Sequence, residues 1–152
     1  MSDVAGAIEL RFARRNDIRS IQRLCSECFP VHYPDSWYAD LVSTAKYLTI
    51  LATLPMRTST GERESSVVGM IVAEYRTLSS CKVIDRTIIH PRLATKSFVM
   101  YILSLGVTSQ FRNCGIASLL LSVVLNHAKL QSRGVDVTSP PFRCLPALAQ
   151  PF

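Results

Sequence analysis

Residues 98–107, FVMYILSLGV, form an almost uninterrupted apolar segment, and this segment constrains the fold more than any other. A short apolar run of this kind is typical of a β-strand that is covered on both faces. A polar loop with one glycine follows at residues 110–115, and residues 116–127 then repeat apolar side chains at helical spacing. A buried strand that leads into an amphipathic helix requires helices packed on a sheet. The sequence therefore predicts a mixed α/β domain.

Shorter patterns predict the other elements of this domain. Strands are expected at residues 8–12, 47–54 and 67–75, and helices at 18–28 and 36–41. Polar or aperiodic sequence predicts a turn at residues 55–66 and a long loop at 77–96. Gly69 inside a strand marks a bulge or a close backbone approach. We assign residues 1–134 to the domain and 135–152, with four of the eight prolines, to a divergent tail.

Composition excludes several classes of protein. The chain has 152 residues, the size of one domain, and its 48% hydrophobic and 18% charged residues exclude a disordered protein. No apolar run reaches the roughly 18 residues of a spanning helix, and acidic and arginine residues near the start argue against a secretory signal. Five cysteines, an odd number, indicate reduced thiols and a cytoplasmic location.

The net charge of +6 lies entirely in the second half of the chain. Residues 1–76 hold nine basic and nine acidic residues, whereas residues 77–152 hold eight basic residues and two acidic ones. Such a field attracts phosphate groups, nucleic acid, acidic proteins or anionic membranes. The basic residues are scattered rather than clustered, which argues against specific nucleic-acid binding.

The loop between the apolar strand and the last predicted helix has the features of an anion site. N–H groups at a helix start, with its positive dipole end, bind anions. Gly115 and the small Ala117 allow close backbone approach, and Arg112 adds a positive charge. The site suits a pyrophosphate, but it lacks both the P-loop and the dinucleotide fingerprint. The alternative is that residues 112–117 form an ordinary turn between a strand and a helix and bind no anion.

Two segments resemble a known family. Strand 101–107 with Arg112-x-x-Gly115-x-Ala117 resembles the acetyl-CoA-binding motif of the GNAT acetyltransferases. Residues 29–38, FPVHYPDSWY, resemble the peptide-binding loop of N-terminal acetyltransferases of the NatE and NatF catalytic-subunit type. The PDSWY run at 34–38 and residues 68–74 favour the NatF type. The resemblance covers about residues 8–134. It implies the GNAT acyl-CoA N-acyltransferase fold, incomplete at the C-terminus.

The resemblance also implies roles for individual residues, with no metal. Tyr101 matches the catalytic tyrosine, and Phe29, Tyr33 and Leu103 match residues that contact the substrate peptide. The positions that match cofactor-binding residues are Leu105, Gly106, Val107, Arg112, Asn113, Cys114, Gly115, Ile116, Ala117 and Ser118. Backbone N–H groups of residues 105–107 could polarise the thioester carbonyl. A plain core position is the alternative for Tyr101.

The activity implied by the resemblance is transfer of acetyl from acetyl-CoA to the α-amino group of proteins that keep their initiator methionine. Acetylation of histone lysines, a chromatin-regulating activity, is the implied side reaction. The implied protein is a monomer in the cytoplasm. Its relatives associate with the cytosolic face of Golgi membranes through a C-terminal region for which we find no counterpart in this sequence.

The sequence departs from the family pattern at three places. Ala117 replaces the usual glycine, and His32 stands where the NatF pattern has an acidic residue. After Gly134 the expected strand with a catalytic histidine, and the segment that completes the cofactor site, have no counterpart. An inactive truncated isoform with weak or no CoA binding is therefore the second hypothesis, and a basic interaction module with salt-sensitive nucleic-acid binding is the third.

The remaining cysteines and histidines have simpler explanations. Cys25 and Cys28 have no partner pair for zinc, so core positions on a helix are expected. His127 is expected to be a partly buried packing residue and His90 a loop residue, while His32 is left as a candidate substrate contact.

Overall fold

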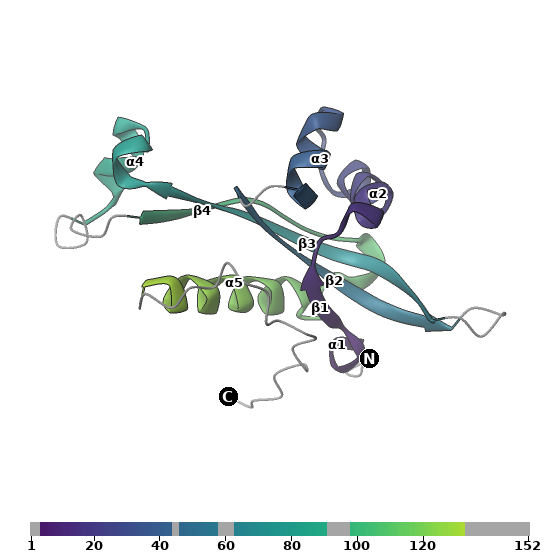
Figure 1. Cartoon of the computed structure of the whole chain (residues 1–152). Coiled ribbons are helices and arrows are strands. Elements are labelled where there is room, and N and C mark those ends of the chain that lie inside the picture. The colour runs from purple at the N-terminus through teal and green to yellow at the C-terminus, as the bar shows by residue number, and fades with distance from the viewer. Residues whose placement is uncertain (1–3, 44–45, 58–62, 91–97, 133–152) are drawn as a thin grey trace.

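The computed structural model describes residues 4–43, 46–57, 63–90 and 98–132. Its centre is one antiparallel sheet in which the strands follow chain order, β1-β2-β3-β4 (Figure 1). The strands are β1 (Glu9–Phe12), β2 (Tyr47–Arg57), β3 (Arg63–Thr77) and β4 (Phe98–Val107). Among the described residues β4 pairs only with β3, so it forms one edge of the sheet.

Helices cover the two faces of this sheet. The helices are α1 (Val4–Ala7), α2 (Ile18–Cys28), α3 (Asp35–Ser43), α4 (Val83–Ile88) and α5 (Ile116–Ser132). Helices α2, α3 and α4 lie on one side of the sheet and α5 lies on the other (Figure 1). No helix within the described ranges has the length and apolar character needed to cross a membrane.

The alternation of side chains along the strands divides the core into two layers. Leu51, Met70 and Val72 pack with Ile21 and Leu24 of α2 on one face of the sheet. The residues between them in sequence, such as Ile50, Ala52, Ile71 and Ala73, pack with Ile116, Leu120 and Val124 of α5 on the other. Because neighbouring strand residues point to opposite faces, a sheet covered on both sides explains the continuous apolar strands.

Gly69 allows α5 to lie close to the sheet. A Cβ atom at this position would be 3.2 Å from Ile116 Cγ2 and 3.3 Å from Leu120 Cδ1. The pairing register between β2 and β3 also shifts beside it, since Ala52 pairs with Gly69 and Thr53 pairs with Val67. The prediction of a bulge or close approach at Gly69 is thus confirmed, and both features are present.

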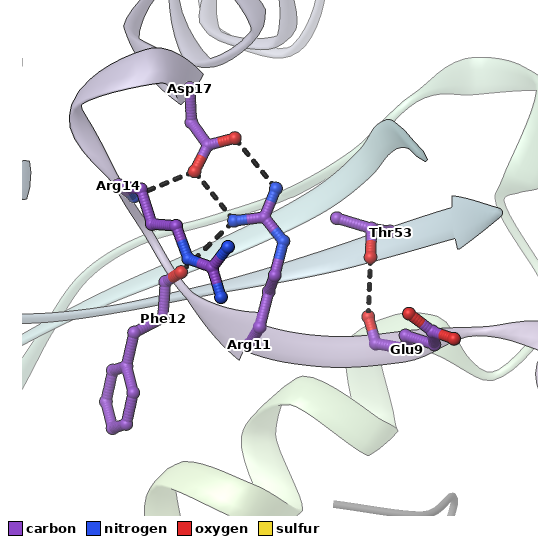
Figure 2. A network of polar contacts seen from close by, with 6 residues as sticks. All are labelled: Glu9, Arg11, Phe12, Arg14, Asp17 and Thr53. Carbon is purple, nitrogen blue, oxygen red and sulfur yellow. Dashed lines mark hydrogen bonds and ion pairs between the residues drawn. The ribbon is translucent and has the colours of Figure 1, made fainter. Parts of the chain in front are cut away.

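A polar network fixes the entry into α2 (Figure 2). The Arg11 guanidinium donates to both carboxylate oxygens of Asp17, each at 2.7 Å, and the Arg14 N–H donates to Asp17 Oδ2 at 2.7 Å. Burial raises the pKa of Asp17, but the Arg11 and Arg14 bonds outweigh it and hold that pKa below its ordinary value. Nearby, the Thr53 hydroxyl donates to the Glu9 carbonyl at 3.1 Å. The bonds of Asp17 anchor β1 to the start of α2, and the Thr53 bond ties β1 to β2.

Three expectations about the elements were wrong. The expected loop at residues 77–96 contains the 3₁₀ turn Leu78–Ser80 and helix α4 in its described part. Strands β2 and β3 extend to Arg57 and from Arg63, into the expected turn. Strand β4 has the expected bounds but is not covered on both faces throughout, because Phe98, Ile102 and Leu103 are 65%, 44% and 41% exposed. Residues 133–152, which include the expected tail, lie outside the described residues.

Candidate active site

The loop between β4 and α5 turns by means of two residues with left-handed backbone. Asn113 has φ 61° and Gly115 has φ 79°, and asparagine and glycine are the residues that best tolerate this conformation. The N–H of Leu119 donates to the carbonyl of Gly115 at 3.0 Å, so α5 makes its first turn here. The backbone N–H groups of that first turn have no acceptor within the helix and point outward from its start. The loop and the helix start therefore form an anion-binding arrangement.

Residues of this loop line two adjoining cavities. One of about 350 Å³ is bounded by Val107, Phe111, Arg112, Asn113, Gly115, Ile116, Ala117 and Ser118. The other, of about 290 Å³, is bounded by Cys28, Phe29, Leu105, Gly106, Val107, Arg112 and Ala117. Because Val107, Arg112 and Ala117 border both, an extended ligand can run from the start of α5 to the end of β4.

Arg112 and Cys114 point in different directions from this loop. The Arg112 Nε donates to the Val107 carbonyl at 3.1 Å, and the residue is exposed, so its charge faces solvent at the cavity. Cys114 is half-buried and packs against the core beneath α5, and its thiol donates to the Arg112 carbonyl at 3.5 Å. Of the predicted cofactor residues, the Cys114 side chain is the one that borders neither cavity.

Three consecutive side chains at the end of α2 and just after it contact the end of β4 and the turn that follows it. They are Glu27, Cys28 and Phe29, which we call the brace. Glu27 Oε1 accepts the Ser109 N–H at 2.6 Å and the Ser109 hydroxyl at 2.8 Å. The Cys28 thiol donates to the Val107 carbonyl at 3.4 Å. Phe29 covers Gly106 so closely that a Cβ atom there would lie 2.9 Å from Phe29 Cζ.

An aromatic wall continues from the brace along the loop to α3. The rings of Phe29 and Tyr33 meet edge to face at 6.4 Å, and Tyr33 stacks on Trp37 at 4.0 Å. Phe29 borders the second cavity, which places a predicted substrate residue against the predicted cofactor residues of β4. His32 is exposed beside this wall.

Tyr101 lies at the other end of β4 and borders neither cavity. Its hydroxyl donates to Asp85 Oδ2 of α4 at 2.9 Å, and the Arg76 guanidinium lies 5.2 Å from its ring centre. Contact with the Cys81 thiol, burial and the bond to Asp85 all raise the pKa of Tyr101 well above its ordinary value. The phenol therefore keeps its proton at neutral pH.

Leu103 sits at an irregularity in β4. Val72 pairs with Ser104 and Ala73 pairs with Ile102, so Leu103 has no partner on β3. Such a bulge bends the strand and re-aims the side chains beside it. Leu103 is consequently exposed at the edge of the sheet, between Tyr101 and the residues that border the cavities.

Sequence reasoning missed four residues that shape this region. Glu27 and Cys28 precede the aromatic wall, Ser109 precedes the phosphate-type loop, and Asp85 lies in a segment without periodicity. Only proximity in sequence to a predicted site residue could have indicated the first three. Asp85 carried no signal, because its contact with Tyr101 depends on how the loop before β4 folds.

A larger cavity and the cysteine pair do not enlarge the site. A space of about 430 Å³ lies beside the 3₁₀ turn Ser109–Phe111 and is bounded by none of the predicted site residues. Within the described ranges no cluster of three metal-ligating side chains occurs. Burial raises the pKa of the Cys25 thiol to about 11, which disfavours the thiolate that a metal would require. His127 is buried and bonded to Tyr75, as a packing residue would be.

Comparison with known proteins finds similarity to acetyltransferases in both sequence and structure. A relative from Danio rerio, N-alpha-acetyltransferase 60, is 40% identical over 120 residues, which cover 79% of this chain and 46% of the relative. The chain spans about half the length of the curated relatives it matches. The crystal structure of Arabidopsis thaliana NAA60 in complex with acetyl-CoA has a TM-score of 0.65 at 21% identity, covering 80% of this chain and 68% of that one.

A further solved structure is Arabidopsis thaliana Naa50 in complex with the bisubstrate analogue CoA-Ac-MVNAL. It has a TM-score of 0.55 at 25% identity, covering 81% of this chain and 65% of that one. Residues 18–140 match the model of the acetyltransferase (GNAT) family, and this segment contains α2, the sheet from β2 to β4 and α5. The chain belongs to the acetyltransferase (GNAT) family.

Proposed function

We propose that this chain binds acetyl-CoA and transfers its acetyl group to the N-terminal amine of proteins that begin with methionine. The observation that carries the proposal is the pair of adjoining cavities that runs from the start of α5 to the end of β4, beside the aromatic wall. The relatives named N-alpha-acetyltransferase 60 and the analogue with a Met-Val start bound by the Naa50 relative support it.

The residues present fit acetyl-CoA. The pyrophosphate would meet the N–H groups at the start of α5 and the Arg112 guanidinium, with Gly115 leaving open space above the backbone. The pantetheine arm would follow the backbone of residues 105–107 past Phe29. Acetyl-CoA supplies an activated thioester, and outward N–H groups of the β4 edge would polarise its carbonyl.

Tyr101 acts in this proposal as a proton-holding group rather than as a phenolate base. Its bond to Asp85 and its raised pKa keep the hydroxyl protonated. A free α-amino group has a pKa of about 8, so an appreciable fraction is already neutral at pH 7 without a strong base. If the hydroxyl leaves Asp85, the phenol would donate a hydrogen bond to the CoA sulfur that leaves and would keep its own proton.

The same chemistry orders the candidate amines. A lysine side chain has a pKa of about 10.4, so a much smaller fraction is neutral at pH 7 than for an α-amine. Histone lysine acetylation, with a part in chromatin regulation, is therefore proposed as a slower side reaction.

We propose residues 1–134 as the acetyltransferase domain and 135–152 as a tail, in a monomeric cytoplasmic protein. Association with the cytosolic face of Golgi membranes, which the family resemblance implies, is tested by fractionating cells that express the tagged chain.

The direct test combines cofactor binding with turnover. Acetyl-CoA should raise the melting temperature of the chain, and a peptide that begins Met-Val should be acetylated at its α-amine. Tyr101→Phe should lower turnover several-fold while the affinity for CoA stays the same. Tyr75→Phe is the matched control, because Tyr75 also loses a bonded hydroxyl but bonds to His127 of α5 instead.

Other outcomes select among the hypotheses. Little or no stabilisation by acetyl-CoA, together with no acetylation and no nucleic-acid binding, would support the inactive isoform. Unchanged melting temperature, together with salt-sensitive binding to nucleic acid, would support the basic interaction module. Unchanged turnover in Tyr101→Phe would remove Tyr101 from the catalytic residues.

A further inference from the structure

Within the brace, Glu27 differs from Cys28 and Phe29 because it contacts a residue beyond the end of β4. Cys28 and Phe29 touch the strand itself, whereas Glu27 reaches past the end of β4 to Ser109. Ser109 begins the 3₁₀ turn Ser109–Phe111, which leads directly into Arg112 and the loop with left-handed backbone at Asn113 and Gly115. Glu27 is thus the contact from α2 to the start of the candidate phosphate loop.

The geometry of this contact is that of a cap. A single carboxylate oxygen, Glu27 Oε1, accepts both the N–H and the hydroxyl of Ser109 at 2.6 and 2.8 Å. The first N–H of such a turn has no acceptor inside the turn, and a carboxylate is a strong partner for it. Because the two residues are 82 positions apart in sequence, the bond joins two separate elements.

The charge of Glu27 opposes the function that its position serves. A carboxylate beside a site for phosphate groups repels them, so electrostatics alone would favour a neutral residue here. The bonds from the Ser109 N–H and hydroxyl, with the nearby Arg112 charge, hold the pKa of Glu27 below its ordinary value, so the group stays ionised. The ionised carboxylate is thus a strong acceptor for both donors of Ser109.

We propose that Glu27 is a positioning residue that holds the β4–α5 loop in the shape that binds the pyrophosphate of CoA, acting through Ser109. This inference rests on the proposed function. It adds to the site a residue that does not touch the ligand and that controls affinity for one substrate only.

The test uses variants that remove the two halves of the bond. Glu27→Ala removes the acceptor, and Glu27→Gln keeps an acceptor oxygen but removes the charge. Ser109→Pro removes both donors and suits the first position of a turn, since Thr108 before it has φ −55° and ψ 145°, a conformation that precedes proline readily. Glu9→Ala is the control, because Glu9 is an exposed acid on β1 and its removal changes the net charge equally.

We expect Glu27→Ala and Ser109→Pro each to weaken CoA binding about tenfold in calorimetry, which is the loss of about one charge-assisted bond. Combined, they should weaken it no further than either alone. Glu27→Gln should bind close to wild type. The KM for acetyl-CoA should rise, whereas kcat and the KM for peptide should stay near wild type. Glu9→Ala should bind CoA as wild type does.

Two results would overturn the role of Glu27. The first is tighter CoA binding by Glu27→Ala, as electrostatic repulsion alone predicts. The second needs no ligand: hydrogen exchange at the amides of residues 109–112 should speed up in Glu27→Ala, and unchanged exchange would contradict the proposal. If the wild-type chain binds no CoA, the proposed function fails, and the exchange measurement still decides whether Glu27 holds the loop.

Discussion

The two ends of β4 differ in how they are held. At its C-terminal end, Gly106 and Val107 are buried, with the brace of α2 on one face and α5 on the other. At its N-terminal end, Phe98, Ile102 and Leu103 are exposed to solvent. Tyr101, between these exposed residues, obtains its described polar partners from α4 and the turn before it.

This difference separates the proposed binding residues from the proposed catalytic residue within one strand. The candidate cofactor site is built from residues 105–118 and the end of α2, which pack together in the described structure. The candidate catalytic residue depends on a short helix whose apolar side chains, Val83, Ile84 and Ile88, are largely exposed. We therefore expect the binding end to be rigid and the Tyr101 end to be more sensitive to its surroundings.

The largest expected effect tests the packing of the binding end. Leu120 of α5 is fully buried against Gly69, so Leu120→Ala should lower the free energy of unfolding by about 2–5 kcal/mol. Leu125→Ala on the same helix, at a side chain that is 46% exposed, should lower it by about 0.5 kcal/mol or less. Denaturant unfolding measures both. Equal losses would show that α5 is not the support we describe.

A smaller effect separates the two ends by function. Arg112→Ala should weaken CoA binding about tenfold, because it removes a charged donor at the loop. Arg86→Ala should leave CoA affinity unchanged but lower acetyl transfer, because Arg86 donates to the carbonyls of Cys81 and Ser79 and so holds α4 beside Tyr101. Calorimetry and a peptide acetylation assay measure the pair. A loss of CoA affinity in Arg86→Ala would show that the Tyr101 end of β4 also affects cofactor binding.

The smallest effect concerns pH near the Tyr101 end. Burial lowers the pKa of His127, which bonds to Tyr75 under the sheet. The folded state therefore binds fewer protons than the unfolded state, and stability is lost as pH falls below the ordinary histidine pKa of 6.5. Unfolding of the wild type at pH 7.5 and 5 should show this loss, and His127→Gln should reduce it. The same slope in both proteins would assign the effect to other groups.

Much of the binding end was predictable from sequence because its signals are local. The bounds of β4, the turn at residues 110–115 and the start of α5 follow from periodicity and one glycine. The family resemblance supplied candidate roles for Phe29 and Arg112, which the structure places against the same cavity. Those roles themselves stay predictions, because they need a ligand to test them.

The rest depended on contacts between distant segments. The Glu27–Ser109 and Tyr101–Asp85 bonds join residues 82 and 16 positions apart, and no periodicity signals them. Helix α4 was missed because its six residues bury no side chain and so show no amphipathic pattern. The partial exposure of β4 was missed for a related reason. An apolar run predicts burial only if another element covers it.

The contact between Phe29 and Gly106 has a thermodynamic consequence. The Phe29 ring forms a wall of the cavity at β4 and at the same time begins the aromatic surface proposed for the peptide. A ligand that shifts this ring from one side changes the space available on the other, so the two binding equilibria are linked. If both proposed ligands bind, then by reciprocity whatever factor acetyl-CoA applies to peptide affinity, the peptide must apply to acetyl-CoA affinity. Because Gly106 has no side chain, the Phe29 ring packs directly on the strand backbone and alone separates the cavity from the aromatic surface.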